Sequence, residues 1–143
     1  MVVVVICGIV FDIIILNFIV ECCKNLTIYL RNDAYTEFSF LGGIYIMNTS
    51  TVNGKKYWTS TDGKYCIWYN NFEKNNKWKV SKLDYLGSTK GLLSSEPDYQ
   101  CPNNILWKYN TSDRGWVPAG TNIKILCNMG MFSLLFFSKI KCL

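Results

Sequence analysis

Residues 55–82, KKYWTSTDGKYCIWYNNFEKNNKWKVSK, decide the fold of this chain. The stretch contains three short runs in which aromatic or aliphatic residues alternate with polar ones, separated by Asp62-Gly63 and by an asparagine-rich segment at 71–76. Such alternation is typical of β-strands, because successive side chains of a strand point to opposite faces. The stretch therefore predicts an antiparallel meander of three strands.

Two turns set the expected register of this meander. Asp62-Gly63 is a preferred sequence for a two-residue type I′ turn, in which both central residues have positive φ. A two-residue loop fixes how its flanking strands pair, and a loop at 71–76 does the same for the third strand. The expected cross-strand pairs are Tyr57 with Trp68, Trp58 with Ile67, Tyr69 with Trp78, and Ile67 with Val80.

Opposed residues share a face of the sheet, so both turns assign the same apolar side chains to one face. We predict that this face is the core, formed by Trp58, Tyr65, Ile67, Tyr69, Trp78 and Val80. The other face carries a cross-strand row of Tyr57, Trp68 and Lys79. Aromatic rings beside a polar donor match sugars, which makes this row a candidate ligand site. Packing of the row beneath another segment, with a cation–π contact, is the alternative that the sequence favours.

The composition excludes several classes of function. The 143 residues suffice for one domain with a buried core, and 15% aromatic residues favour β structure. No histidine is present, which excludes His-based acid–base catalysis, Ser-His-Asp and Cys-His nucleophiles, and His-containing zinc sites. None of the seven cysteines forms a C-x-x-C pair, and the net charge of +5 contains no basic run. We expect a protein that is not an enzyme, with no metal, no cofactor and no nucleic-acid partner.

Residues 1–20, MVVVVICGIVFDIIILNFIV, are almost wholly apolar. They predict a secretory signal peptide or a signal-anchor within residues 1–22, and an anchor would tether the protein to a membrane. Asp12 weakens the anchor, because a carboxylate in the middle of a bilayer costs about 2.5–3.5 kcal/mol on insertion scales. The absence of a basic residue before the apolar run weakens the signal peptide, and a buried β-strand is the third interpretation.

Glycosylation and the remaining strands follow from shorter patterns. Asn25, Asn48 and Asn110 each begin an N-x-S/T sequence, which predicts glycosylation of a secreted domain. Alternating residues predict further strands at 26–30, within 37–47, at 105–109, at 116–117 and at 122–127. The segment 83–104 carries glycines, prolines and serines and is expected to be an irregular loop. Residues 128–143 form an apolar-basic tail that is too short to span a membrane.

The ordered pattern of the middle of the chain resembles a known type of module. It consists of G-x-Y at 43–45, N-G-K-x-Y-W at 53–58, Y-x-I-W-Y at 65–69, W-x-V at 78–80, C-P at 101–102, W-x-Y at 107–109, G-W at 115–116 and I-x-I-x-C at 123–127. This resembles a short disulfide-closed β module that recurs in extracellular mosaic proteins of invertebrates and protists. The resemblance covers residues 41–127, implies a disulfide between Cys101 and Cys127, and supplies no catalytic residues.

The other cysteines leave alternatives open. Cys22 and Cys23 are adjacent, so they are not expected to pair with each other. One of them can pair with Cys66, which would leave the other for an intermolecular bond or palmitoylation. The second alternative is that both belong to a cleaved or membrane-embedded segment.

Together these patterns predict an all-β protein: an antiparallel meander that forms a small β-sandwich or a partly open barrel with a disulfide staple. Its expected parts are a signal or anchor at 1–22, an extracellular module at 23–127 and the tail at 128–143. The expected role is recognition or adhesion without catalysis, with an extracellular glycan or protein as partner. The alternative is a purely structural unit of a larger secreted or membrane-tethered assembly.

Overall fold

The computed structural model describes residues 21–72 and 76–128. The predicted signal segment and the C-terminal tail lie outside the described residues, apart from their ends nearest the domain. Within the described ranges, no helix is long and apolar enough to cross a membrane. The elements are β1 (Asn25–Leu30), α1 (Asn32–Phe38), β2 (Gly43–Val52), β3 (Lys55–Ser60), β4 (Tyr65–Asn70), β5 (Lys77–Lys82), β6 (Leu93–Pro97), β7 (Trp107–Thr111), β8 (Gly115–Pro118) and β9 (Ile123–Cys127), with short 3-10 helices at Ser39–Leu41 and Leu83–Tyr85.

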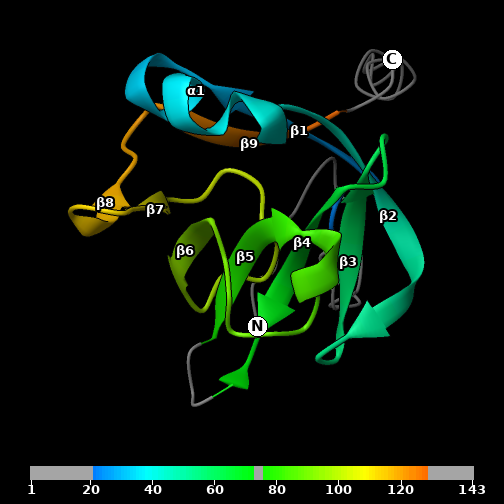
Figure 1. The fold of residues 1–143 in the computed structure, drawn as a ribbon. Coiled ribbons are helices and arrows are strands. Elements are labelled where there is room, and N and C mark those ends of the chain that lie inside the picture. Colours follow the sequence, from blue (N-terminus) through cyan, green and yellow to red (C-terminus); the bar gives the residue numbers. More distant parts are fainter. Residues whose placement is uncertain (1–20, 73–75, 129–143) are drawn as a thin grey trace, which may run out of the picture.

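The described strands form one antiparallel sheet in the order β8-β7-β6-β5-β4-β3-β2-β1-β9. Figure 1 shows the sheet curling, with α1 in cyan lying over β9 and β1. Eight of the strands follow one another as a meander, and β9 returns to pair with β1 at the far edge. The prediction of an all-β antiparallel fold is confirmed, with the partly open barrel as its form.

The register predicted from the turns is confirmed where the pairing is recorded. Trp58 opposes Ile67, Tyr69 opposes Trp78, and Ile67 opposes Val80. The predicted apolar face is the core, with Trp58, Ile67, Tyr69, Trp78 and Val80 buried and Tyr65 packed at its margin.

The segment from α1 to Leu41 covers the open side of the curled sheet. The Phe38 ring lies 5.8 Å from the ring of Tyr109 on β7, and the Phe40 ring lies 5.4 Å from the ring of Tyr65 on β4. This short segment therefore joins strands that are far apart in the sheet. The sequence pattern did not predict α1.

The type I′ turn forms at a different place from the one predicted. At Asp62-Gly63 only the glycine has positive φ, at 73°, and the Gly63 N–H donates to the Ser60 carbonyl. The Asp62 carboxylate instead accepts hydrogen bonds from the Ser60 hydroxyl and the Lys64 N–H, which holds Asp62 out of the left-handed region. The prediction of a type I′ turn there is wrong, although the register that it implied is correct.

Asn53-Gly54 has the backbone that a type I′ turn requires. Its φ angles are 53° and 80°, and the flanking residues Val52 and Lys55 pair across β2 and β3. The Asn53 amide also donates to the Tyr69 carbonyl at 2.9 Å, so this turn is tied to the neighbouring strand.

The expectation of an irregular loop over 83–104 is wrong in its middle. Leu93–Pro97 forms β6, which pairs with β5 on one side and β7 on the other. Its sequence, LSSEP, has one apolar residue, so no alternation announces a strand. Ser94 and Ser95 are nevertheless buried, and the Ser95 hydroxyl accepts a hydrogen bond from the Trp78 N–H at 2.9 Å. Small polar residues satisfied in this way can occupy an interior strand.

Two disulfides close the domain, with pairings that differ from the expected one. Cys22 is bonded to Cys101 and Cys23 to Cys127, so the direct Cys101–Cys127 bond implied by the resemblance is wrong. The reason is the antiparallel pairing of β1 with β9, in which Leu26 opposes Cys127 and brings it to the residues just before β1. Both adjacent cysteines are therefore used, and neither is bonded to Cys66.

Cys66 is a free, fully buried thiol on β4. Burial raises its pKa to about 12, so almost none of it is thiolate near neutral pH. We expect Cys66 of the folded protein to react with iodoacetamide at pH 8.5 at least 100-fold more slowly than in 6 M urea. Peptide mapping by mass spectrometry gives the rate for Cys66 separately from the other cysteines. Similar rates in the two conditions would show that this face of β4 is open.

Candidate functional site

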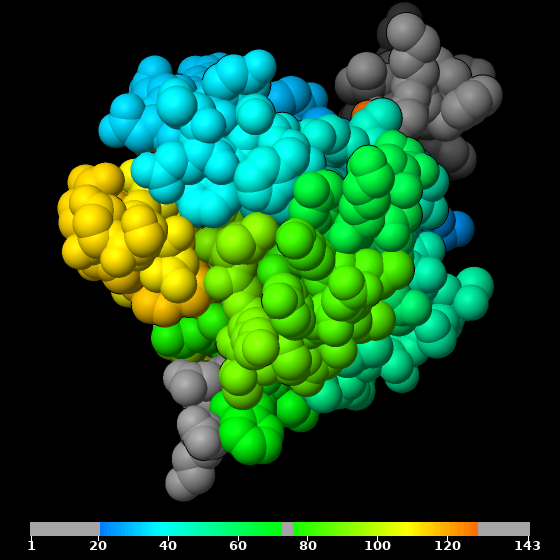
Figure 2. Space-filling model, viewed as in Figure 1, coloured from blue at the N-terminus to red at the C-terminus, as the bar shows by residue number. Residues whose placement is uncertain are grey.

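The predicted row of Tyr57, Trp68 and Lys79 is not an open surface. The Trp68 side chain is fully buried, and its indole N–H donates to the Ser88 carbonyl at 3.3 Å. Ser88 belongs to the segment 83–92, which crosses this face of the sheet. The yellow-green surface in the middle of Figure 2 belongs to this part of the chain. Trp68 is therefore packed beneath another segment of the chain, which is the alternative that the sequence favours.

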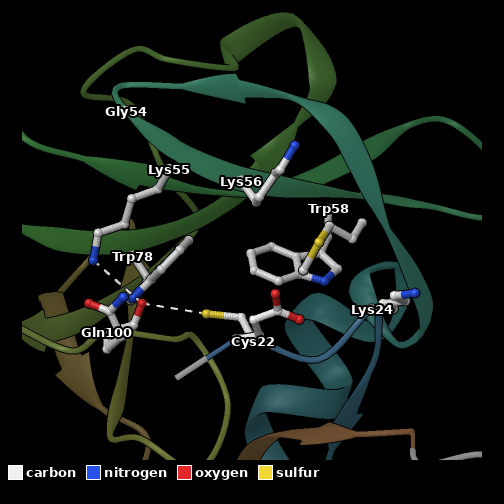
Figure 3. Close-up of a pocket in the computed structure, with 10 residues that line it drawn as sticks. Cys22, Lys24, Gly54, Lys55, Lys56, Trp58, Trp78 and Gln100 are labelled. Atoms are coloured by element: carbon white, nitrogen blue, oxygen red, sulfur yellow. Dashed lines mark hydrogen bonds between the residues drawn. The ribbon is translucent and has the colours of Figure 1, made fainter. Parts of the chain in front are cut away.

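One pocket lies between the N-terminal disulfide segment and β3, with a volume of about 330 Å³ (Figure 3). Two of its lining side chains bond to backbone carbonyls at its edge. The Lys55 ammonium donates to the carbonyls of Tyr99 and Gln100, and it lies 3.9 Å from the centre of the Tyr69 ring. The indole of Trp78 donates to the same Tyr99 carbonyl at 3.0 Å. These contacts fasten the segment around Gln100 to the sheet, and the charged side chains of Glu21, Lys24 and Lys56 complete the lining of the pocket.

A second cleft lies on the opposite, outer face of β5, β6 and β7, with a volume of about 400 Å³. It lies within the range of about 300–1,000 Å³ that is usual for small-molecule sites. We call it the lysine cleft, and its lining is Asn70, Phe72, Lys77, Lys79, Thr89, Ser94, Ser95, Lys108 and Trp116.

Strand register builds the floor of the lysine cleft. Lys79 on β5 opposes Ser94 on β6, and Ser94 in turn opposes Lys108 on β7. Because opposed residues share a face, the three form a row across the outer side of the sheet. Trp116 on β8 opposes Asn110, two residues after Lys108, and so stands at one end of the same face.

Lys79 is the unusual residue of this cleft. Only 8% of its surface is exposed, yet among the described residues no hydrogen bond or ion pair is formed by its ammonium group. The ammonium lies 4.7 Å from the centre of the Trp116 ring, within the range of a cation–π contact. Burial, and then the charge of Lys77, lower the pKa of Lys79. Lysine residues with so little exposed surface are usually paired with an anionic group.

The other charged groups give the cleft a net positive charge. The Lys108 ammonium is 2.7 Å from a carboxylate oxygen of Glu96, and both side chains are about one third exposed. That pairing holds the pKa of Glu96 below its usual range, so Glu96 stays charged. Three lysines thus face one glutamate among the described residues, and the charge of Lys77 and Lys79 is not offset.

Trp116 supplies a flat apolar surface beside these charges. Its side chain is 42% exposed, whereas the other tryptophans of the chain are buried. One of the predicted glycosylation sites, Asn110, is the cross-strand partner of Trp116 and is exposed, so a glycan there would lie at the rim of the cleft. Asn25 is exposed too, while Asn48 is half-buried with its amide nitrogen 2.6 Å from the Thr59 hydroxyl.

The sequence identified Lys79 as a site residue and missed its neighbours in the cleft. Tyr57, which it also selected, is half-buried with its hydroxyl 3.3 Å from that of Ser50, and it does not line the lysine cleft. Lys108 and Trp116 were visible in the sequence only as parts of later strands. Recognising β6 between β5 and β7 would have placed Lys108 two strands from Lys79 on the same face.

The cleft has no feature of a metal site. Within residues 21–72 and 76–128, no group of three or more cysteine, aspartate or glutamate side chains is placed to hold a metal ion. Comparison with protein-family models, with curated proteins and with solved structures found no match to this chain. The function is therefore argued from the residues of this chain.

Gly91 packs closely against the side chain of Lys79. A Cβ added at Gly91 would lie 2.9 Å from Cδ of Lys79 and 3.1 Å from the Leu93 carbonyl oxygen. We expect Gly91→Ala to lower the free energy of unfolding by about 1–3 kcal/mol through overpacking, as measured by urea denaturation. In a double-mutant cycle with Lys79→Ala, most of this loss should disappear, because the crowded side chain is then gone. Fully additive losses would mean that Gly91 is crowded by the backbone alone.

Proposed function

We propose that this chain is a non-catalytic extracellular recognition module, and that the lysine cleft is its ligand site. The observation that carries the proposal is Lys79, whose side chain is 8% exposed and whose ammonium group has no anionic partner among the described residues, beside the half-exposed Trp116 ring. Charged groups that are partly removed from water gather at functional sites. The hydroxyl groups of Thr89, Ser94 and Ser95 also line the cleft, and the chain contains no histidine to act on them as a base.

The two disulfides support the extracellular part of the proposal. Disulfides form and persist in oxidising compartments and are rare in the reducing cytosol. The apolar residues 1–20 and the glycosylation sequences at Asn25 and Asn110 agree with secretion or membrane anchoring. The resemblance to a module of extracellular mosaic proteins points the same way and stays a prediction.

The test is a ligand screen with the full chain produced through a secretory pathway. The protein is presented to an array of glycans and of extracellular matrix proteins, and Trp116→Ala is screened beside it. We expect saturable binding that Trp116→Ala weakens at least tenfold while the circular dichroism spectrum is retained. Absence of saturable binding to every component would reject the recognition function.

A structural role is the second candidate, and one observation favours it. Ile44 and Ile46 on β2 and Tyr29 on β1 lie on one outer face, with 43%, 51% and 52% of their surfaces exposed. Exposed apolar groups of this kind mark contact surfaces. If the chain is a unit of an assembly, sedimentation should show self-association that Ile46→Lys abolishes, with no ligand found in the screen.

A further inference from the structure

We propose that the lysine cleft binds an anionic saccharide, with a pyranose ring on Trp116 and the carboxylate or sulfate group at Lys79 and its neighbouring lysines. This inference rests on the proposed recognition function and specifies its ligand class. It is argued from charge, from the shape of the cleft and from the position of the cleft in the sheet.

The first step is charge. Lys77 and Lys79 alternate along β5 and therefore point to the same side, where Lys108 joins them across β6. Only Lys108 has an anionic partner among the described residues, namely Glu96. A ligand anion in the cleft would pair with the ammonium group of a side chain that is largely buried along its length. Part of the desolvation cost of Lys79 is therefore met in folding, and the bound anion would gain a charge-assisted contact.

The second step is the shape and polarity of the lining. The Trp116 ring is half-exposed, and such a ring matches the apolar face of a pyranose. The same cleft is lined by the amide of Asn70 and the hydroxyl groups of Thr89 and Ser94, which offer polar atoms to sugar hydroxyls. Small polar donors, one flat ring and a positive charge together suit a charged sugar better than an apolar ligand.

The third step distinguishes a saccharide from an acidic peptide. Extended peptides commonly bind by adding a strand to the exposed edge of a sheet. The floor of the cleft instead lies over β5, β6 and β7, which are interior strands with neighbours on both sides, whereas Trp116 comes from the edge strand β8. The backbone groups of the three interior strands are used within the sheet, so the floor of the cleft offers side chains alone to a ligand. This arrangement favours a compact ring with an anionic substituent.

The test uses four probes with the full disulfide-bonded chain and isothermal titration calorimetry. Hyaluronan hexasaccharide carries carboxylates only, keratan sulfate oligosaccharide carries sulfates only, hexa-N-acetylchitohexaose is neutral, and a decapeptide of glutamate is the acidic peptide. We expect at least one of the two anionic saccharides to bind at least tenfold more tightly than hexa-N-acetylchitohexaose and than the peptide. Which of them binds assigns the anion as carboxylate or sulfate.

Two variants locate the binding. Lys79→Met keeps the length of the side chain and removes the buried charge, so it should weaken binding at least tenfold while the melting temperature stays the same or rises. Lys124→Ala removes one exposed lysine of β9, outside the cleft, and should weaken binding less than twofold. The same comparison is made with Asn110→Gln, so that a glycan at the rim cannot hide the cleft.

Several outcomes would overturn the inference. Equal losses of affinity in Lys79→Met and Lys124→Ala would mean that the saccharide is attracted to the basic protein in general. Tighter binding of the glutamate peptide than of the saccharides would mean that the ligand is an acidic protein segment. If the screen finds a neutral ligand and Trp116→Ala abolishes its binding, the lysine cleft is still the ligand site, but the inference that the ligand is an anionic saccharide is wrong. If no component of the screen binds either, the recognition function fails with it.

Discussion

Replacing Cys23 and Cys127 together with alanine is expected to lower the free energy of unfolding by about 3–4 kcal/mol. The bond joins residues 104 positions apart, and a loop of about 100 residues corresponds to about 4.7 kcal/mol in the chain-entropy model. The neighbouring Cys22–Cys101 bond remains, however, and already shortens the loop that the second bond closes. With Cys101 and Cys127 only 26 positions apart, the effective loop is short and the loss is about 3.5 kcal/mol.

The loss from removing both disulfides should be larger than either single loss. When the second disulfide is removed, the loop of about 100 residues is no longer closed. The total loss of free energy of unfolding then approaches the whole stability of a small domain, which is about 5–15 kcal/mol. Urea denaturation of the two single-disulfide variants and of the protein without disulfides measures these values. Cys66→Ala is the control, because it alters a buried cysteine without opening a loop, and it should cost about 1 kcal/mol.

The pairing itself is checked by non-reducing peptide mapping. Because Cys22 and Cys23 are adjacent, one peptide containing both should be linked to two others, carrying Cys101 and Cys127. A peptide pair joined directly from Cys101 to Cys127 would contradict the structure and restore the pairing that the sequence resemblance implied.

The second large effect is expected for Trp78→Ala, at about 3–5 kcal/mol of lost stability. The Trp78 side chain is 1% exposed, and its ring meets those of Trp58 and Tyr69 edge-on at 5.7 and 5.2 Å. Truncation removes both ring contacts, takes away one of the two hydrogen-bond donors of the Tyr99 carbonyl and opens a cavity beside the pocket of Figure 3. Urea denaturation gives the change in free energy.

Trp116→Ala is the matched control for Trp78→Ala. The same side chain is removed, but from a position that is 42% exposed, so the expected loss is below about 1 kcal/mol. A loss for Trp116→Ala as large as that for Trp78→Ala would mean that the lysine cleft is part of the core. The contrast between the two tryptophans thus separates fold residues from site residues.

The central meander was predictable from the sequence because its signals are local. Alternation in three short runs and two turns determine which of Trp58, Ile67 and Val80 oppose one another, whatever the exact turn geometry. The type of the Asp62-Gly63 turn was not predictable in the same way. The turn type depends on the hydrogen bonds that the Ser60 hydroxyl and the Lys64 backbone N–H donate to the Asp62 carboxylate, which compete with the type I′ conformation.

The missed elements depend on contacts between distant residues. The sequence of β6 carries no alternation, and it forms a strand because β5 and β7 lie on its two sides. The helix α1 is a single short segment whose Phe38 is held against Tyr109 of β7. The disulfide pairing follows from β9 returning to β1, a long-range connection that cysteine spacing does not reveal.

Because these elements were not predicted, the sequence identified only part of the candidate site. Lys79 could be assigned to the outer face from the meander alone, and so could Trp68. The segment 83–92 covers Trp68, and its path was not predicted. Strand β6 brings Lys108 and Trp116 to the cleft, and it was not predicted either. The sequence places a candidate site on the outer face of the meander, but Lys108 and Trp116 of the lysine cleft come from strands that the pattern did not connect.

The most direct test of the account is to follow the five tryptophan indole N–H signals by nuclear magnetic resonance while the best-binding saccharide is added to ¹⁵N-labelled protein. If the lysine cleft is the ligand site, the Trp116 signal moves progressively and saturably, and the signals of Trp58 and Trp78, which line the pocket of Figure 3, stay in place. Saturable movement of Trp58 or Trp78 with Trp116 unchanged would place the ligand in the other pocket and contradict the account.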